Sequence, residues 1–122
     1  MRRFLIITNT DKDKDFAVTN QIKSYLEKCH CETSLCTDIY DEAYLQEDGE
    51  KKIEGEFEAA IVLGGDGTIL RACRVLRQKE VPILGVNLGT VGFLAEIEPE
   101  FVMEALQFVV EGNYKCEERM LL

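Results

Sequence analysis

Short, continuous apolar runs alternate along this chain with segments whose apolar positions recur every three or four residues. The runs cover residues 4–7, 59–63 and 81–86, and turn-forming residues follow each of them. Continuous apolar runs of this kind are typical of strands that are buried on both faces. We therefore predict strands over residues 4–7, 57–63 and 81–86 in the centre of a parallel sheet.

Three segments have the spacing of amphipathic helices. Residues 14–28 and 67–79 each follow a predicted strand, and their apolar positions fall on one helical face. A last helix is predicted to begin at Glu98-Pro99-Glu100, because proline suits the first helical turn and acidic residues suit the positive end of the helix dipole. Gly112-Asn113 is expected to end that helix.

The segments between these elements carry weaker signals. Residues 31–37 are polar enough to form a short strand at the edge of the sheet. Residues 38–58 are strongly acidic, with Lys51 and Lys52 as their only basic residues. A metal-binding acidic loop is one reading of this stretch, but we expect a solvated connection with one helical turn at most, because blocks of like charge repel one another.

The alternation of strands and helices predicts an α/β fold, a parallel three-layer sheet with helices on both faces and right-handed crossovers. With 122 residues, the chain has the length of one domain. Sheets of this kind bind ligands beyond the carboxyl ends of their strands. The segments that follow the predicted strands are therefore where a functional site is expected.

The strongest such segment is Gly64-Gly65-Asp66-Gly67-Thr68, between a predicted strand and a predicted helix. Glycines let the backbone approach a phosphate closely, and the first N–H groups of a helix have no intrahelical partner. Asp66 would repel phosphate, which suggests a metal bridge or a proton acceptor. The alternative is a tight turn whose glycines only permit positive φ, with Asp66 exposed. The spacing fits neither the dinucleotide fingerprint nor a Walker P-loop.

The same five residues resemble a motif of NAD kinases, of diacylglycerol-type lipid kinases and, slightly altered, of phosphofructokinases. A second stretch, Gly85-Val86-Asn87-Leu88-Gly89-Thr90-Val91-Gly92-Phe93-Leu94, is similar to the Gly-x-Asn-x-Gly-x-x-Gly-Phe-Leu signature of NAD kinases. Lipid kinases continue differently at this point. The resemblance to NAD kinases covers about half of the chain, from the strand before Gly64 to Arg119-Met120-Leu121.

This resemblance implies a Rossmann-like nucleotide-binding domain over residues 1–118, with residues 119–122 beginning a missing β-rich second domain. It implies phosphoryl transfer from ATP or polyphosphate to the 2′-hydroxyl of the adenosine ribose of NAD, which forms NADP with the help of Mg²⁺. It further implies a homo-oligomer in the full-length enzyme. The chain itself would then be a fragment that is inactive alone. A lipid kinase module and a non-catalytic nucleotide-binding domain are the alternative functions.

The resemblance also implies roles for individual residues. Asp66 would be catalytic: it would take the proton of the attacking hydroxyl or hold Mg²⁺ through water, and no other metal ligand is assigned. The nucleotide-binding residues would be Gly64, Gly65, Gly67, Thr68, Arg71, Asn87, Gly89 and Phe93. The Thr68 hydroxyl would be a further donor to phosphate. Arg71 could instead lie at the surface, as is expected for Arg74, and Phe93 could instead be part of the core.

Charge and cysteine content narrow the possible partners. The net charge of -9 argues against nucleic acid and anionic membranes, and hence against a lipid kinase. The five cysteines are odd in number and contain no Cys-x-x-Cys pair, so we expect reduced thiols in a soluble, cytoplasmic protein. Cys29-His30-Cys31 has poor spacing for zinc and is expected to mark a helix end turning into a strand. No segment resembles a signal peptide or a membrane span.

Overall fold

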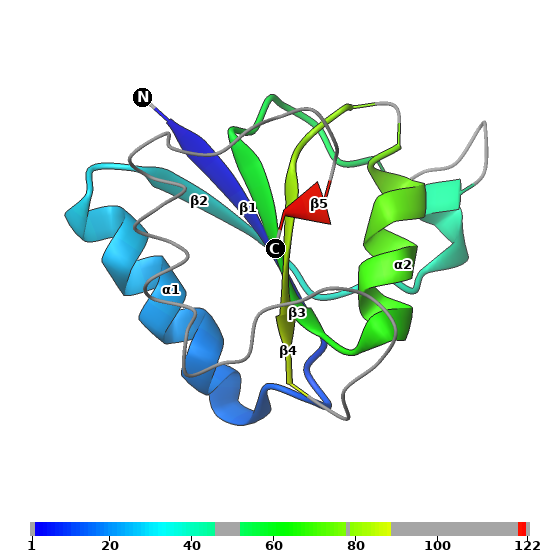
Figure 1. The fold of residues 1–122 in the computed structure, drawn as a ribbon, viewed down its shortest axis with the longest axis horizontal. Helices are drawn as coiled ribbons and strands as arrows, with labels where there is room; N and C mark the ends of the chain where they lie inside the picture. The colour runs from blue at the N-terminus through cyan, green and yellow to red at the C-terminus, as the bar shows by residue number, and fades with distance from the viewer. Residues whose placement is uncertain (1, 46–51, 78, 89–119, 122) are drawn as a thin grey trace.

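The computed structural model describes residues 2–45, 52–77, 79–88 and 120–121, which form a parallel sheet flanked by helices (Figure 1). The strands run in the order β2-β1-β3-β4-β5, and every neighbouring pair is parallel. The strands are β1 (Arg3–Thr8), β2 (Glu32–Cys36), β3 (Ala59–Gly64), β4 (Ile83–Asn87) and β5 (Met120–Leu121). The helices are α1 (Ala17–Lys28) and α2 (Asp66–Val75), with short 3-10 helices η1 (Lys14–Phe16) and η2 (Glu42–Leu45).

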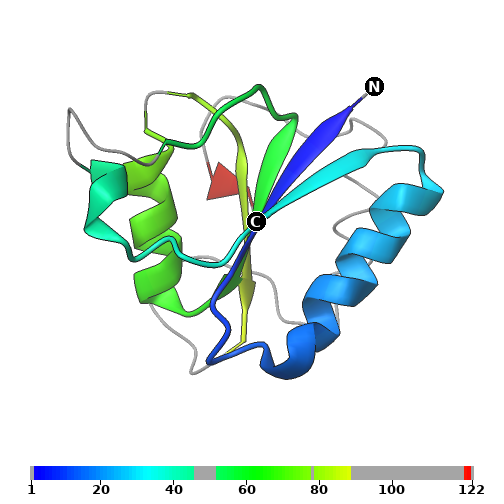
Figure 2. The ribbon, with the colours of Figure 1, turned by 180° about the vertical axis from the view of Figure 1, so that it is seen from behind.

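The two α-helices lie on opposite faces of the sheet, as Figures 1 and 2 show from front and back. Because side chains alternate along a strand, β1 sends Phe4 and Ile6 into one core and Leu5 and Ile7 into the other. α1 closes the first core with residues such as Ile22, and α2 closes the second with residues that include Ile69 and Ala72. The predicted three-layer α/β architecture is confirmed.

The order of the strands places a topological switch point between β1 and β3. β1 and β3 are neighbours, but the chain leaves β1 for α1 on one face and leaves β3 for α2 on the other. Connections that diverge in this way leave room for a ligand at the carboxyl ends of the two strands. The backbone N–H of Asn9 donates to the carbonyl of Leu63 at 2.8 Å, which joins the two strand ends just below this point.

α1 begins three residues later than the sequence pattern predicts. Asp15 and Phe16 have positive φ values of 58° and 56°, which an α-helix cannot contain. The carboxylate of Asp13 instead caps the helix: it accepts hydrogen bonds from the backbone N–H groups of Val18 at 2.9 Å and Thr19 at 2.8 Å. The Thr19 hydroxyl also donates to this carboxylate at 2.6 Å. Asp13 therefore supplies the side-chain acceptor that an N-cap residue usually provides.

The acidic stretch contains the expected helical turn, which is η2. It is nevertheless more than a solvated connection, because Ile39 is buried in the core that α2 covers. The described residues contain no group of three His, Cys, Asp or Glu that could hold a metal ion, in this stretch or elsewhere. Residues 46–51 lie outside the described part of the chain.

Beyond Leu88 the structure describes only β5. Met120 and Leu121 pair with Ile83 and Leu84, so they lie at the edge of the α/β sheet, whereas the sequence assigned them to the start of a second domain. A domain boundary after residue 118 remains a prediction. The helix expected between Glu98 and Asn113 lies outside the described residues.

The segment around Cys29-His30-Cys31 and the free thiols agree with the sequence analysis. His30 has a φ of 62° and follows the last turn of α1, and the N–H of Cys31 donates back to Leu26, so this segment is a helix end that turns into a strand. Cys29, Cys31, Cys36 and Cys73 are free thiols. Burial raises the pKa of Cys31 and of Cys36, which keeps both thiols protonated. No helix within the described ranges has the length and apolar character needed to span a membrane.

Candidate functional site

The glycine-rich motif forms the turn between β3 and α2, at the switch point between β1 and β3. Gly65 is the N-cap residue in an extended conformation (φ -104°, ψ -167°), and its carbonyl accepts the N–H of Ile69 at 3.1 Å. Among the described glycines only Gly55 has a positive φ. The alternative in which the motif's glycines serve to permit positive φ is therefore wrong for this turn.

The glycines of the turn are needed for space instead. A Cβ atom at Gly64 would lie 2.5 Å from the Thr68 Oγ1 and 2.7 Å from the Thr68 Cβ, which is too close for atoms that are not bonded. At Gly65 an added Cβ would meet nothing within 4 Å. Gly64 thus makes room for the helix to pack against the end of its own strand, and Gly65 faces open space where a ligand can approach the backbone.

Thr68 ties three segments together. Its side chain is 1% exposed, and its hydroxyl accepts a hydrogen bond from the Asn9 Nδ2 at 3.1 Å. The Tyr40 hydroxyl lies 3.0 Å from the same Thr68 oxygen. The hydroxyl that the sequence offered as a phosphate donor is therefore engaged with the loop after β1 and the loop after β2.

Asp66 is the first residue of α2 and is partly buried, whereas the alternative reading of the motif had it exposed. Its Oδ1 is shielded from solvent. The positive end of the helix dipole favours a carboxylate at this place. The structure thus places a carboxylate at the start of α2, directly after the first two glycines of the turn.

The second glycine-bearing stretch meets the first at the same edge of the sheet. Asn87 ends β4 directly opposite Gly64 and is 5% exposed. The N–H of Leu88 donates to the carbonyl of Gly64 at 3.0 Å. The two motifs, separated by about twenty residues in sequence, are thus joined by a backbone hydrogen bond at the carboxyl ends of β3 and β4. Gly89 and Phe93 lie outside the described residues, so their predicted roles remain predictions.

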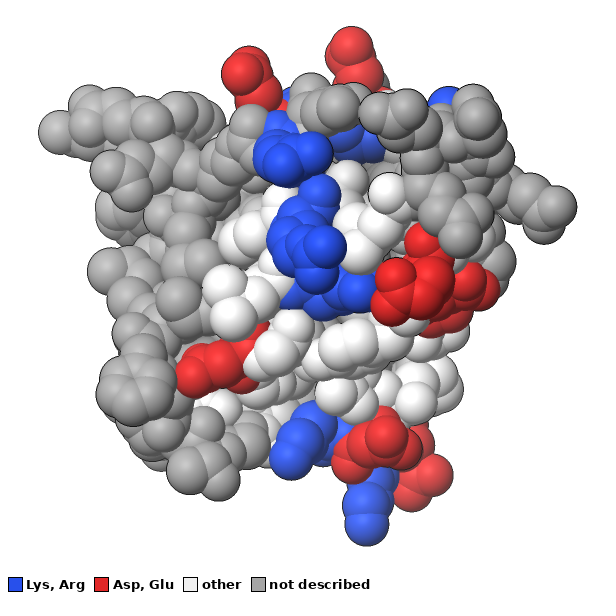
Figure 3. Space-filling model, turned by 90° about the vertical axis from the view of Figure 1, so that its right-hand side faces the viewer, with Lys and Arg blue, Asp and Glu red and all other residues white. Residues whose placement is uncertain are grey.

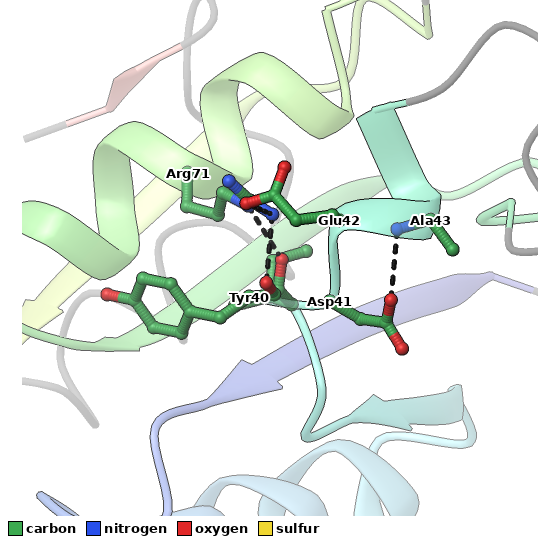
Figure 4. A network of polar contacts seen from close by, with 6 residues as sticks. Tyr40, Asp41, Glu42, Ala43 and Arg71 are labelled. Atoms are coloured by element: carbon green, nitrogen blue, oxygen red, sulfur yellow. Dashed lines mark hydrogen bonds and ion pairs between the residues drawn. The ribbon is translucent and has the colours of Figure 1, made fainter.

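Arg71 does not lie at the surface, and its guanidinium contacts the loop after β2 (Figure 4). Its Nε donates to the carbonyl of Ile39 and its Nη2 to the carbonyl of Tyr40, both at 2.9 Å. The same Nη2 lies 3.4 Å from the Glu42 Oε1. Arg74 is exposed, as predicted. Figure 3 shows the band of Lys and Arg side chains on this side of the molecule, with acidic side chains beside it.

Sequence reasoning missed two residues of this arrangement. Asn9 follows the first predicted strand, but the sequence analysis assigned no role to it. Tyr40 was missed altogether, because it lies in the acidic stretch, which has no apolar periodicity. No pattern in the sequence predicts that the Tyr40 hydroxyl contacts Thr68.

Comparison with known proteins identifies the domain. Residues 4–114 match the family model described as the ATP-NAD kinase N-terminal domain. The chain is 42% identical over 124 residues to the NAD kinase of Lachnoclostridium phytofermentans, covering all of this chain and 42% of that protein. It is 38% identical over 123 residues to the NAD kinase of Methanothermobacter thermautotrophicus, with 100% and 44% covered.

A solved structure shares the fold. The crystal structure of yeast NADH kinase complexed with NADH superposes with a TM-score of 0.66 at 18% identity, over 91% of this chain and 38% of that one. At this identity the likeness concerns the fold alone. The chain spans roughly two fifths of the length of the curated relatives that it matches. With a family model that matches nearly its whole length, the chain belongs to the NAD kinase family and corresponds to the N-terminal domain.

Proposed function

We propose that the whole protein transfers a phosphoryl group from ATP or polyphosphate to the 2′-hydroxyl of the adenosine ribose of NAD, which yields NADP. The observation that carries this proposal is the open glycine turn with Asp66 at its side, within a domain that matches the NAD kinase family. The family match does not favour the lipid kinase alternative. A non-catalytic nucleotide-binding domain would not need a carboxylate at this turn.

The turn supplies the phosphate contacts in this proposal. The first N–H groups of an α-helix have no intrahelical acceptor, and in α2 these include the N–H groups of Gly67 and Thr68. Open space at Gly65 lets phosphate oxygens reach them. Thr68 would then contribute through its backbone, because its hydroxyl is already engaged. Asn87, at the end of β4, would contribute an amide to the same cleft.

Asp66 would orient the attacking hydroxyl and accept its proton as the new bond forms. Mg²⁺ is also part of the proposal, and the described residues suit one mode of Mg²⁺ binding. The described residues offer the Asp66 carboxylate but no cluster of three ligands, which suits a cation held jointly by one carboxylate, water and substrate phosphates. Bound Mg²⁺ would neutralise charge on the transferred phosphoryl group.

We further propose a cytoplasmic location, which the free thiols support because such thiols persist in reducing compartments. The choice between ATP and polyphosphate, and the predicted homo-oligomer, follow only from the family resemblance.

The test is Asp66→Asn in the whole protein, assayed with ATP or polyphosphate, Mg²⁺ and NAD. Loss of a positioned base should lower kcat by about 10²–10⁴-fold while ATP affinity is kept. Asp15→Asn is the matched control: it removes an exposed carboxylate at a positive-φ position, which asparagine tolerates. An unchanged kcat in Asp66→Asn would remove Asp66 from the chemistry. A wild-type protein that forms no NADP with either donor would overturn the proposed function.

A further inference from the structure

Tyr40 is half exposed, yet its position is fixed from two sides. Its side chain is 52% exposed. Its hydroxyl lies 3.0 Å from the Thr68 Oγ1. An added Cβ at Gly67 would lie 3.3 Å from the same Tyr40 hydroxyl, so this hydroxyl sits directly over the first turn of α2.

The backbone of the loop is held by α2 itself. Arg71 donates to the carbonyls of Ile39 and Tyr40, and its guanidinium carbon lies 5.9 Å from the centre of the Tyr40 ring. Ile39 is 1% exposed and anchors the segment in the core. A planar guanidinium that donates to two successive carbonyls fixes the direction as well as the distance of the loop. The Tyr40 side chain is therefore presented to Thr68 by a rigid support.

The hydrogen bonds at Thr68 restrict the orientation of its hydroxyl. A threonine hydroxyl has one proton to donate and can accept two hydrogen bonds. Asn9 donates to it, and Tyr40 takes up a second direction. In helices threonine populates two side-chain rotamers. The two neighbours together select one of them, the one in which Thr68 packs against Gly64.

We propose that Tyr40 is a positioning residue of the phosphate turn: its hydroxyl, presented by Arg71, holds Thr68 against Gly64 and thereby fixes the backbone N–H groups at the start of α2. This inference rests on the proposed function, since it concerns the same phosphate site. It gives Arg71 an indirect part in nucleotide binding, through the loop that it holds. It also assigns a function to the first residues of the acidic stretch.

The test is a double-mutant cycle in the whole protein. The variants are Tyr40→Phe, Thr68→Val and the double variant, each measured for the KM of ATP, the KM of NAD, kcat, the Kd of ATP by calorimetry, and Tm. Loss of one neutral hydrogen bond in Tyr40→Phe should raise the KM and Kd of ATP by roughly three- to tenfold. The KM of NAD should stay within about twofold, which is too little for a lost hydrogen bond.

The cycle separates action through Thr68 from direct contact with the ligand. If Tyr40 acts through the Thr68 hydroxyl, the double variant should bind ATP no more weakly than Thr68→Val alone, because the two changes remove the same interaction. Tyr44→Phe is the matched control, since it removes a hydroxyl from the neighbouring η2 that donates to Asp38 and not to Thr68. That variant should leave both KM values unchanged.

Three results would overturn the inference. One is an unchanged ATP affinity in Tyr40→Phe, and another is an additive loss in the double variant, which would mean that Tyr40 contacts the ligand directly or acts independently. The third is an equal rise in both KM values with a lowered Tm, which would mean a purely structural role. A wild type that binds ATP but makes no NADP refutes the proposed function while the binding cycle still decides this inference. A wild type that does not bind ATP overturns this inference, and it also overturns the proposed function if polyphosphate yields no NADP either.

Discussion

Gly64 and Gly65 are neighbours in one turn, but a side chain would meet different surroundings at each. At Gly64 the space is filled by the Thr68 side chain, so the glycine is a packing requirement of the fold. At Gly65 no atom of the described residues lies within 4 Å of an added Cβ, so packing among those residues does not require a glycine there. Under the proposed function, the approach of a phosphate to the backbone explains this glycine.

This contrast predicts opposite outcomes for two alanine substitutions. Gly64→Ala should lower the free energy of unfolding by about 1–3 kcal/mol, because the new methyl group collides with Thr68. Gly65→Ala should leave stability nearly unchanged and weaken ATP binding, because its methyl group lies where phosphate approaches. Urea unfolding and ATP titration of both variants check this. Equal losses of stability would favour a purely structural turn.

At the scale of elements, one buried carboxylate marks where α1 begins. The Asp13 carboxylate accepts three hydrogen bonds from the first turn of α1, two from backbone N–H groups and one from the Thr19 hydroxyl. Asp13 is 3% exposed, and the Thr19 hydroxyl lies 2.7 Å from that of Thr8 in β1. The cap therefore also links α1 to the end of the neighbouring strand.

Asp13→Ala should lower the free energy of unfolding by about 1–3 kcal/mol, because buried N–H groups would lose their acceptor. Asp11→Ala in the same loop is the control. Its side chain is exposed, so its effect should stay within about 0.5 kcal/mol. Denaturant unfolding of both variants provides the comparison. A similar small effect for both would show that the cap contributes little.

The elements were predictable where a local pattern exists. The apolar runs marked β1, β3 and β4, and the spacing of apolar residues marked α1 and α2. The boundaries of the helices were less predictable than their existence. α1 was predicted to begin at residue 14 because its pattern continues through Asp15 and Phe16, but the loop gives these two residues positive φ values. α2 ends at Val75 instead of residue 79, because the chain turns after Leu76.

The site was predictable only in part, for a similar reason. The glycine motif and Asp66 are contiguous in sequence, so they were found together. Tyr40 lies 28 residues before Thr68 in the sequence. Its hydroxyl reaches Thr68 because Arg71 and Ile39 hold the loop after β2 in place. Contacts of this kind depend on the tertiary structure and leave no periodic signal in the sequence.

At the scale of the molecule, the proposed function requires an acidic chain to bind a polyanionic ligand. A net charge of -9 gives no general attraction to phosphates. Binding must then come from local groups: backbone N–H groups of α2, a bound cation and short-range hydrogen bonds. The domain covers roughly two fifths of the length of its relatives, so the remaining contacts to NAD are expected from residues outside this chain.

We therefore expect residues 1–122 alone to fold but to form no NADP. Two buried clusters, one on each face of the sheet, supply a core for folding. Correct orientation of two reactants can lower a reaction barrier by about 7–11 kcal/mol. A domain that positions only one of the two reactants should lose most of this rate enhancement. Circular dichroism of the purified chain and an assay with ATP, Mg²⁺ and NAD check both parts. Robust NADP formation, or an unfolded spectrum, would contradict the expectation.

The backbone hydrogen bonds just beyond the strand ends have a thermodynamic consequence. Asn9 and Leu88 each donate a backbone N–H to the end of β3, to the carbonyls of Leu63 and Gly64. The loops on both sides of the glycine turn are thus pinned before any ligand arrives. Binding to a preorganised site loses little conformational entropy. Most of the free energy of the phosphate contacts should then contribute to the binding affinity, because the turn needs little ordering when the ligand binds.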